Sequence, residues 1–133
     1  MTQRASGMFE IKLDRQPPFD SADGTSLGRS AFVKQFSGDI SGSSRGEMLS
    51  AGNSEVSGSA GYVAIELVRA SLQGKSGSFV FQHVGVLDRG ASELSVKVVP
   101  DSGTGELKGL RGSLSIEIRE GKHFYTFDYT LPA

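Results

Sequence analysis

Residues Gly58–Gly85 read GSAGYVAIELVRASLQGKSGSFVFQHVG, and they carry the strongest structural signal in the chain. Its two arms are rich in β-branched and aromatic residues, and a glycine-containing turn at 72–76 separates them, which predicts a β-hairpin. If the turn is centred between Gly74 and Lys75, Glu66 lies opposite His83. A carboxylate and an imidazole then lie side by side on a face otherwise made of Tyr62, Ala64, Val68, Phe79 and Phe81.

Length and composition exclude several classes of protein. The 133 residues fit one domain spanning 1–133. The net charge of −1, from 14 basic and 15 acidic residues, gives no electrostatic footprint for nucleic acid or an anionic membrane. There is no cysteine, so disulfides and thiolate chemistry are excluded. Residues 1–7 lack an apolar run, and no stretch approaches the roughly 20 apolar residues of a membrane span. We therefore expect a cytoplasmic protein.

Short segments with period-two patterning follow one another along the whole chain, and glycines punctuate them. No segment has the pattern of a helix of three or more turns. Closing a meander of eight strands removes both exposed edges, so the pattern favours a closed eight-stranded antiparallel meander β-barrel over a sandwich. The expected strands are 5–14, 28–40, 44–52, 59–71, 75–87, 92–100, 110–119 and 123–131.

The second face of the central hairpin is apolar as well. A strand that is apolar on both sides needs cover on both sides, and the sequence offers no helix to provide it. We therefore expect a homo-oligomer, with a dimer favoured by base rates. The residues of this second face are Val63, Ile65, Leu67, Val80, Val84 and Val86.

Three turns set the expected registers of the neighbouring strands. A turn centred at 41–42 places Phe36 opposite Glu47, and a looser turn near 56–57 brings Glu47 beside Glu66. A turn at 120–122 pairs Ile118 with His123. These registers gather polar and aromatic side chains in the barrel. The expected ligand-binding residues are Tyr62, Glu47, Lys34, Phe36, Phe79, Phe81, Tyr125 and Phe127.

Glu66 and His83 are the candidates for acid–base chemistry. A carboxylate in an apolar interior is strongly penalised unless it has a partner, so Glu66 would take up a proton or hold His83 charged. A titratable pair in a concave site is the usual setting for general acid–base catalysis. The alternative is a structural role, in which the two side chains satisfy each other as a buried cross-strand pair.

Metal and phosphate sites have little support. The two histidines, His83 and His123, could join Glu47 and Glu66 as a set of metal ligands, but no His-x-His or His-Glu-x-x-His spacing occurs. The glycines at 103–105 lack the Gly-Lys-Ser or Gly-Lys-Thr of a phosphate-binding loop. We expect neither a metal nor a cofactor.

Several segments together resemble the bacterial domain of unknown function 3224 family. They are Gly46–Leu49, Gly58–Glu66, Gly77–Phe79 with Gln82 and His83, Val99–Leu107 and Gly121–Tyr125. The resemblance covers nearly the whole chain. It implies a small closed eight-stranded barrel similar to that of plant allene oxide cyclase. It implies no activity and transfers no catalytic residue, because a shared fold does not by itself carry a function.

Three functions fit these residues. The first is a barrel that binds one small, largely apolar ligand in its interior near the Glu66–His83 pair. The second is a cofactor-free isomerase or cyclase in which Glu66 and His83 act as acid and base. The third is a filled barrel that acts through its surface as an oligomeric interaction module. An interior packed to native density would leave only the third.

Overall fold

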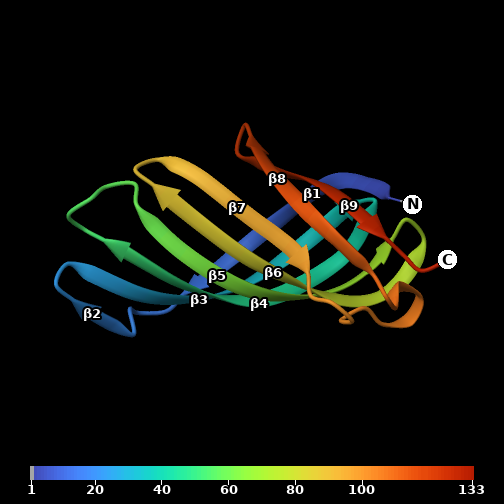
Figure 1. Ribbon diagram of the computed structural model, residues 1–133, viewed down its shortest axis with the longest axis horizontal. Coiled ribbons are helices and arrows are strands. Elements are labelled where there is room, and N and C mark those ends of the chain that lie inside the picture. The colour runs from blue at the N-terminus through green and yellow to red at the C-terminus, as the bar shows by residue number, and fades with distance from the viewer. Residues whose placement is uncertain (1) are drawn as a thin grey trace.

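A single nine-stranded antiparallel sheet closes on itself in this computed structural model, which describes residues 2–133 (Figure 1). The strands pair in the order β1-β9-β8-β7-β6-β5-β4-β3-β2, and β1 also pairs with β3, so that eight strands form a closed barrel. This confirms the predicted fold class. The strands are β1 (Gln3–Arg15), β2 (Asp20–Ala22), β3 (Thr25–Gly38), β4 (Ile40–Asn53), β5 (Ala60–Leu72), β6 (Lys75–Asp88), β7 (Ala91–Val98), β8 (Arg111–Arg119) and β9 (Lys122–Thr130).

The extra strand β2 lies where we expected only a loop. Pro17 and Pro18 separate it from β1, since proline cannot donate to a sheet ladder. Asp23 and Gly24 both have positive φ, of 53° and 80°, and this two-residue turn folds β2 back onto the start of β3. The barrel itself therefore has the eight predicted strands, and β2 is a three-residue addition at its edge.

The register between β8 and β9 is as predicted, with Ile118 opposite His123. The register between β3 and β4 is not. The chain turns at Gly38, which has a φ of 93°, and the predicted turn at 41–42 lies inside β4. Phe36 therefore pairs with Gly42, and Glu47 pairs with Ala31. The shift is an odd number of residues, so Glu47 moves to the outer face of the barrel.

The central hairpin also differs in register from the expectation, with a milder consequence. Gln73 and Gly74 form a two-residue turn with positive φ at both positions, of 47° and 89°. Glu66 therefore pairs with Phe81, and His83 pairs with Ala64. The shift is two residues, so every side chain keeps its predicted face. Glu66 and His83 become diagonal neighbours on the inner face.

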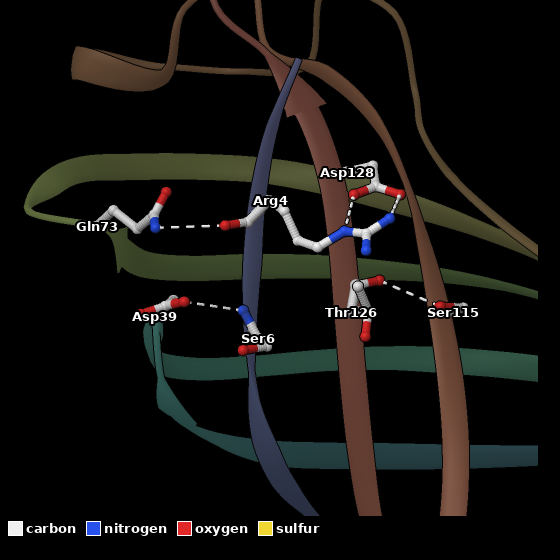
Figure 2. Close-up of polar contacts among 7 residues, drawn as sticks. All are labelled: Arg4, Ser6, Asp39, Gln73, Ser115, Thr126 and Asp128. Carbon is white, nitrogen blue, oxygen red and sulfur yellow. Dashed lines mark hydrogen bonds and ion pairs between the residues drawn. The ribbon is translucent and has the colours of Figure 1, made fainter.

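The barrel closes where β1 lies between β9 and β3. Polar contacts from the β3–β4 and β5–β6 turns and from β9 hold β1 in this position (Figure 2). The Arg4 guanidinium donates two hydrogen bonds to the Asp128 carboxylate, at 2.7 and 3.1 Å. The Ser6 backbone N–H donates to the Asp39 carboxylate at 2.9 Å, and the Gln73 side chain reaches the Arg4 carbonyl at 3.5 Å. The β3–β4 and β5–β6 turns thus dock on β1.

The same end of the barrel is filled with side chains. Phe79 stacks on Phe127 with ring centroids 6.1 Å apart, and Phe81 meets Phe127 edge-on at 5.5 Å. The connection between β7 and β8 carries the 3₁₀-helix η1 (Gly105–Leu107), and its fully buried Leu107 packs into this core.

Among residues 2–133, no helical segment has the length and hydropathy needed to span a membrane.

Replacing Tyr125 by Phe tests the closure of the barrel. The buried Tyr125 hydroxyl accepts a hydrogen bond from the Ile40 N–H at 2.8 Å and donates one to the Ser37 carbonyl at 2.9 Å. Tyr125→Phe leaves a buried donor unpaired and is expected to lower the free energy of unfolding by about 1–3 kcal/mol in urea titrations. Ser115→Ala removes an exposed hydroxyl at the same end and is the control. Equal losses in the two variants would contradict this role of Tyr125.

Candidate functional site

The other half of the barrel is not filled. A cavity of about 220 Å³, which we call the mouth cavity, opens at the end away from η1. Its floor is made of buried side chains and its rim of exposed ones, with Leu13, Leu94 and Ile118 exposed by 45, 39 and 64%. The lining residues are Phe9, Ile11, Leu13, Phe32, Lys34, Met48, Tyr62, Ala64, His83, Leu94, Ile116, Ile118 and His123.

Strand alternation brings these side chains to one place, because every second residue of a strand points into the barrel. Glycine makes room for the largest of them. Tyr62 on β5 pairs with Gly85 on β6, and a Cβ atom at Gly85 would lie 2.1 Å from the Tyr62 ring. Any other residue at Gly85 would therefore displace Tyr62 from the wall of the cavity.

A buried charged cluster lies at the floor. The Glu66 side chain is fully buried, and its Oε1 atom accepts from Lys34 Nζ at 3.1 Å and from His83 Nε2 at 2.7 Å. Its other oxygen, Oε2, accepts from the Ser44 hydroxyl at 2.5 Å. The three donors come from β3, β6 and β4. A carboxylate without access to water thus has three hydrogen bonds, as burial requires.

Lys34 lies against aromatic rings as well as against Glu66. Its Nζ atom is 4.5 Å from the ring centroid of Phe9 and 5.4 Å from that of Phe32. Phe36 follows at 5.9 Å. Such contacts attract a cation to the negative face of each ring, and they strengthen when water is excluded. The ammonium therefore lies between one carboxylate and a set of rings.

The surroundings lower the pKa values of both Glu66 and Lys34, for different reasons. Burial raises the pKa of the Glu66 carboxyl, but the hydrogen bond from His83, the charge of Lys34 and the hydrogen bond from Ser44 together bring it below its ordinary value. Burial lowers the pKa of the Lys34 ammonium, and the charge of Glu66 offsets part of this effect. The pKa of Lys34 thus follows the loss of water, whereas for Glu66 the hydrogen bonds and the neighbouring charge outweigh that loss. We take Glu66 to be ionised at neutral pH.

His83 presents one nitrogen to Glu66 and the other to the cavity. Because the Glu66 carboxylate has only lone pairs, Nε2 of His83 carries the hydrogen of their contact. Within residues 2–133, Nδ1 has no hydrogen-bond partner, yet no buried side-chain nitrogen or oxygen there lacks one. Nδ1 is therefore not sealed in the protein, and His83 lines the mouth cavity.

The structure brings together four of the residues that the sequence singled out. Lys34, Tyr62 and His83 line the mouth cavity, and Glu66 lies beneath them in contact with two of the three. Phe36 is buried beside Lys34 but does not line the cavity. The other predicted aromatic residues belong to the packed half of the barrel; they are Phe79, Phe81, Tyr125 and Phe127.

The prediction that Glu47 belongs to the site is wrong. Glu47 is exposed on the outer face, where its carboxylate accepts a hydrogen bond from Arg29 Nε at 2.7 Å. The error comes from the turn at Gly38, which shifts the β3–β4 register by an odd number of residues. The same shift hid Ser44, which pairs with Lys34 across these strands.

Sequence reasoning also missed Phe9 and Phe32, although a signal for them exists. Phe32, Lys34 and Phe36 alternate along β3 and must share a face. Phe9 pairs with Phe36 across β1 and β3, a contact that only the closure of the barrel creates. His123 lies at the side of the cavity, with its ring 5.0 Å from that of Phe9. No three metal-ligating side chains of residues 2–133 come together.

The buried ion pair gives a stability prediction. Glu66→Gln leaves the Lys34 ammonium without its carboxylate and is expected to lower the free energy of unfolding by about 3–5 kcal/mol at neutral pH. Adding Lys34→Met removes the unpaired charge and is expected to recover most of that loss. Urea unfolding of the single and double variants measures both. The exposed Arg4–Asp128 pair is the control, and Asp128→Asn should have a much smaller effect. A double variant no more stable than Glu66→Gln would contradict the prediction.

Comparison with known proteins agrees with the resemblance seen in the sequence. The model of the family described as Protein of unknown function (DUF3224) matches residues 5–129. The crystal structure of a protein with unknown function from the DUF3224 family of Shewanella oneidensis MR-1 is similar over 100% of both chains, with 43% sequence identity and a TM-score of 0.94. No curated protein matches the chain. The chain therefore belongs to the DUF3224 family of proteins of unknown function.

Proposed function

We propose that this protein binds a small, largely apolar molecule in the mouth cavity. One observation carries the proposal: the barrel is packed with aromatic side chains in one half and hollow in the other. Protein interiors are normally filled to the density of organic crystals. A fold able to fill one half with Phe79, Phe81 and Phe127 could have filled the second half with the same residue types.

The size and lining of the cavity limit the ligand. A volume of about 220 Å³ lies below the roughly 300–1,000 Å³ of sites for drug-sized molecules, so the ligand is smaller than these. Most of the lining is aliphatic or aromatic; Lys34 and His83 lie on the floor, and Tyr62 and His123 add polar groups at the wall. A few convergent polar groups in an apolar cavity are typical of a ligand site.

Binding accounts for the site with fewer assumptions than catalysis. Of the Glu66–His83 pair, only His83 lines the cavity, so Glu66 would act on a substrate through His83 alone. Catalysis would also require a substrate proton placed within hydrogen-bond reach of His83.

The likeness to allene oxide cyclase and the cytoplasmic location stay predictions from the sequence.

We further propose that the outer face of β5 and β6 forms a homodimer interface. Val63 pairs with Val84 on these strands and Leu49 pairs with Val63 from β4, which makes a continuous apolar row on the outside of the barrel. These three side chains are 49, 44 and 48% exposed, and Ile65 and Val86 extend the row at 54 and 46%. Contiguous exposed apolar residues of this kind mark interaction sites.

Filling the mouth cavity tests the ligand proposal. Ala64 lines the cavity, whereas its neighbour Val63 faces outward, so Ala64→Phe and Val63→Phe are a matched pair. With toluene as the probe, saturation-transfer NMR is expected to show binding to the protein and to Val63→Phe but not to Ala64→Phe. Native mass spectrometry of protein purified from its own host shows any small molecule that it retains. Toluene binding that survives Ala64→Phe, or no binding at all, would contradict the proposal.

A charge in the outer row tests the dimer. Light scattering coupled to size-exclusion chromatography is expected to give twice the chain mass for the protein and a single chain mass for Val63→Lys, because a buried unpaired charge opposes association. Ile118→Lys places the same charge on an exposed apolar residue at the rim of the cavity and should leave the dimer intact. A monomeric parent protein would refute the proposal.

A further inference from the structure

We propose that the ligand of the mouth cavity is a small carboxylic acid, held as its carboxylate by Lys34 and His83 at the floor with its apolar part against the wall. The inference rests on the proposed ligand-binding function and names the chemical class of the ligand. It depends on which charged groups the cavity exposes and which it hides.

The titratable groups that line the cavity include no carboxylic acid. They are Lys34, Tyr62, His83 and His123, and the one carboxylate nearby, Glu66, is fully buried beneath them. All three of the donors to Glu66 come from protein side chains. A ligand that enters from the mouth therefore meets an ammonium and an imidazole but no carboxylate. This arrangement favours an oxygen anion and disfavours a cation.

Both floor groups have bonding capacity left for a ligand. An ammonium has three N–H donors, and Glu66 is the only hydrogen-bond acceptor of Lys34 among residues 2–133. Nδ1 of His83 has no partner in the same part of the chain and is not sealed from the cavity. The two side chains bond the same Glu66 oxygen, so Lys34 Nζ and His83 Nε2 lie next to each other on the floor.

Charge balance bears on the binding step as well. The Lys34 ammonium and the Glu66 carboxylate neutralise each other. A ligand carboxylate would add one negative charge to this buried cluster, which is unfavourable away from water unless it is compensated. An imidazole with a hydrogen on both nitrogens compensates it, because its Nδ1–H then donates to the ligand carboxylate. A proton on Nδ1 of His83 therefore favours the bound state.

The groups that face His83 allow this change of charge. Glu66 of β5 accepts from Nε2, and Lys34 of β3 bonds the same carboxylate oxygen. The rings of Phe32 on β3 and Phe81 on β6 meet the imidazole edge-on at 6.4 and 6.3 Å. Tyr62 and His123 are the other titratable groups of the cavity, and burial raises the pKa of Tyr62, which stays a neutral phenol. Among residues 2–133, Glu66 is therefore the only negative charge in contact with the imidazole.

Benzoate and toluene separate this inference from the ligand-binding proposal on which it rests. The two probes share an aromatic ring and differ in the carboxylate. Calorimetric or NMR titration is expected to show benzoate binding at least about tenfold more tightly than toluene, because charge-assisted hydrogen bonds form only with benzoate. Because a proton on Nδ1 favours the bound carboxylate, the affinity for benzoate is expected to rise as the pH is lowered while that for toluene stays constant.

The double variant Lys34→Met/Glu66→Gln removes the ion pair without leaving an unpaired charge. Toluene binding reports that it is folded and that its cavity is intact, and the preference for benzoate is expected to disappear. Three results would each overturn the inference while leaving the ligand site in place. The parent protein could bind toluene as tightly as benzoate, the preference for benzoate could survive the double variant, or the affinity for benzoate could be independent of pH. If neither probe binds the parent protein, the proposed function and this inference both fall.

Discussion

The need to satisfy one buried carboxylate organises the hollow half of this barrel. Glu66 has no contact with solvent and takes its three hydrogen bonds from Lys34, Ser44 and His83 on three other strands. A buried charge without partners is strongly unfavourable, so these strands are held in the one register that supplies all the donors. A slip of a single residue in one of these strands would turn its donor outward and deprive Glu66 of one of its three partners.

The cluster also divides the barrel into two halves with different properties. Towards η1, the aromatic rings of β6 and β9 stack on one another and fill the interior. Towards the mouth, Gly85 leaves room for Tyr62, and the space between the walls stays open. The packed half fixes the strands and the open half is available for a ligand. Lys34 and His83, which line the hollow, are the side chains that the buried carboxylate holds in place.

Much of the architecture could be read from the sequence because local rules determine it. Alternation along β9 placed His123, Tyr125 and Phe127 on one face, and the turn at Glu120–Gly121 fixed their pairing with β8. The turn chemistry of β3–β4 was misjudged, because Gly42 and Gly38 are both plausible turn residues and only Gly38 is used. That one difference moved Glu47 to the outside and hid Ser44. The predicted register of the central hairpin was also wrong, but by two residues, so the predicted inward and outward faces of β5 and β6 were still correct.

Eight strands, the inward faces of β5, β6 and β9, and an acid and a base on neighbouring strands could all be predicted from the amino-acid sequence, because strand alternation is a local property of the backbone. Three features needed the folded barrel: Lys34 and Ser44 complete the partners of Glu66, Phe9 meets Phe36 across the closure, and one half of the barrel is filled while the other is hollow. These contacts join residues far apart in the chain. They depend on register and on the summed volumes of side chains from every strand, which no single segment of sequence contains.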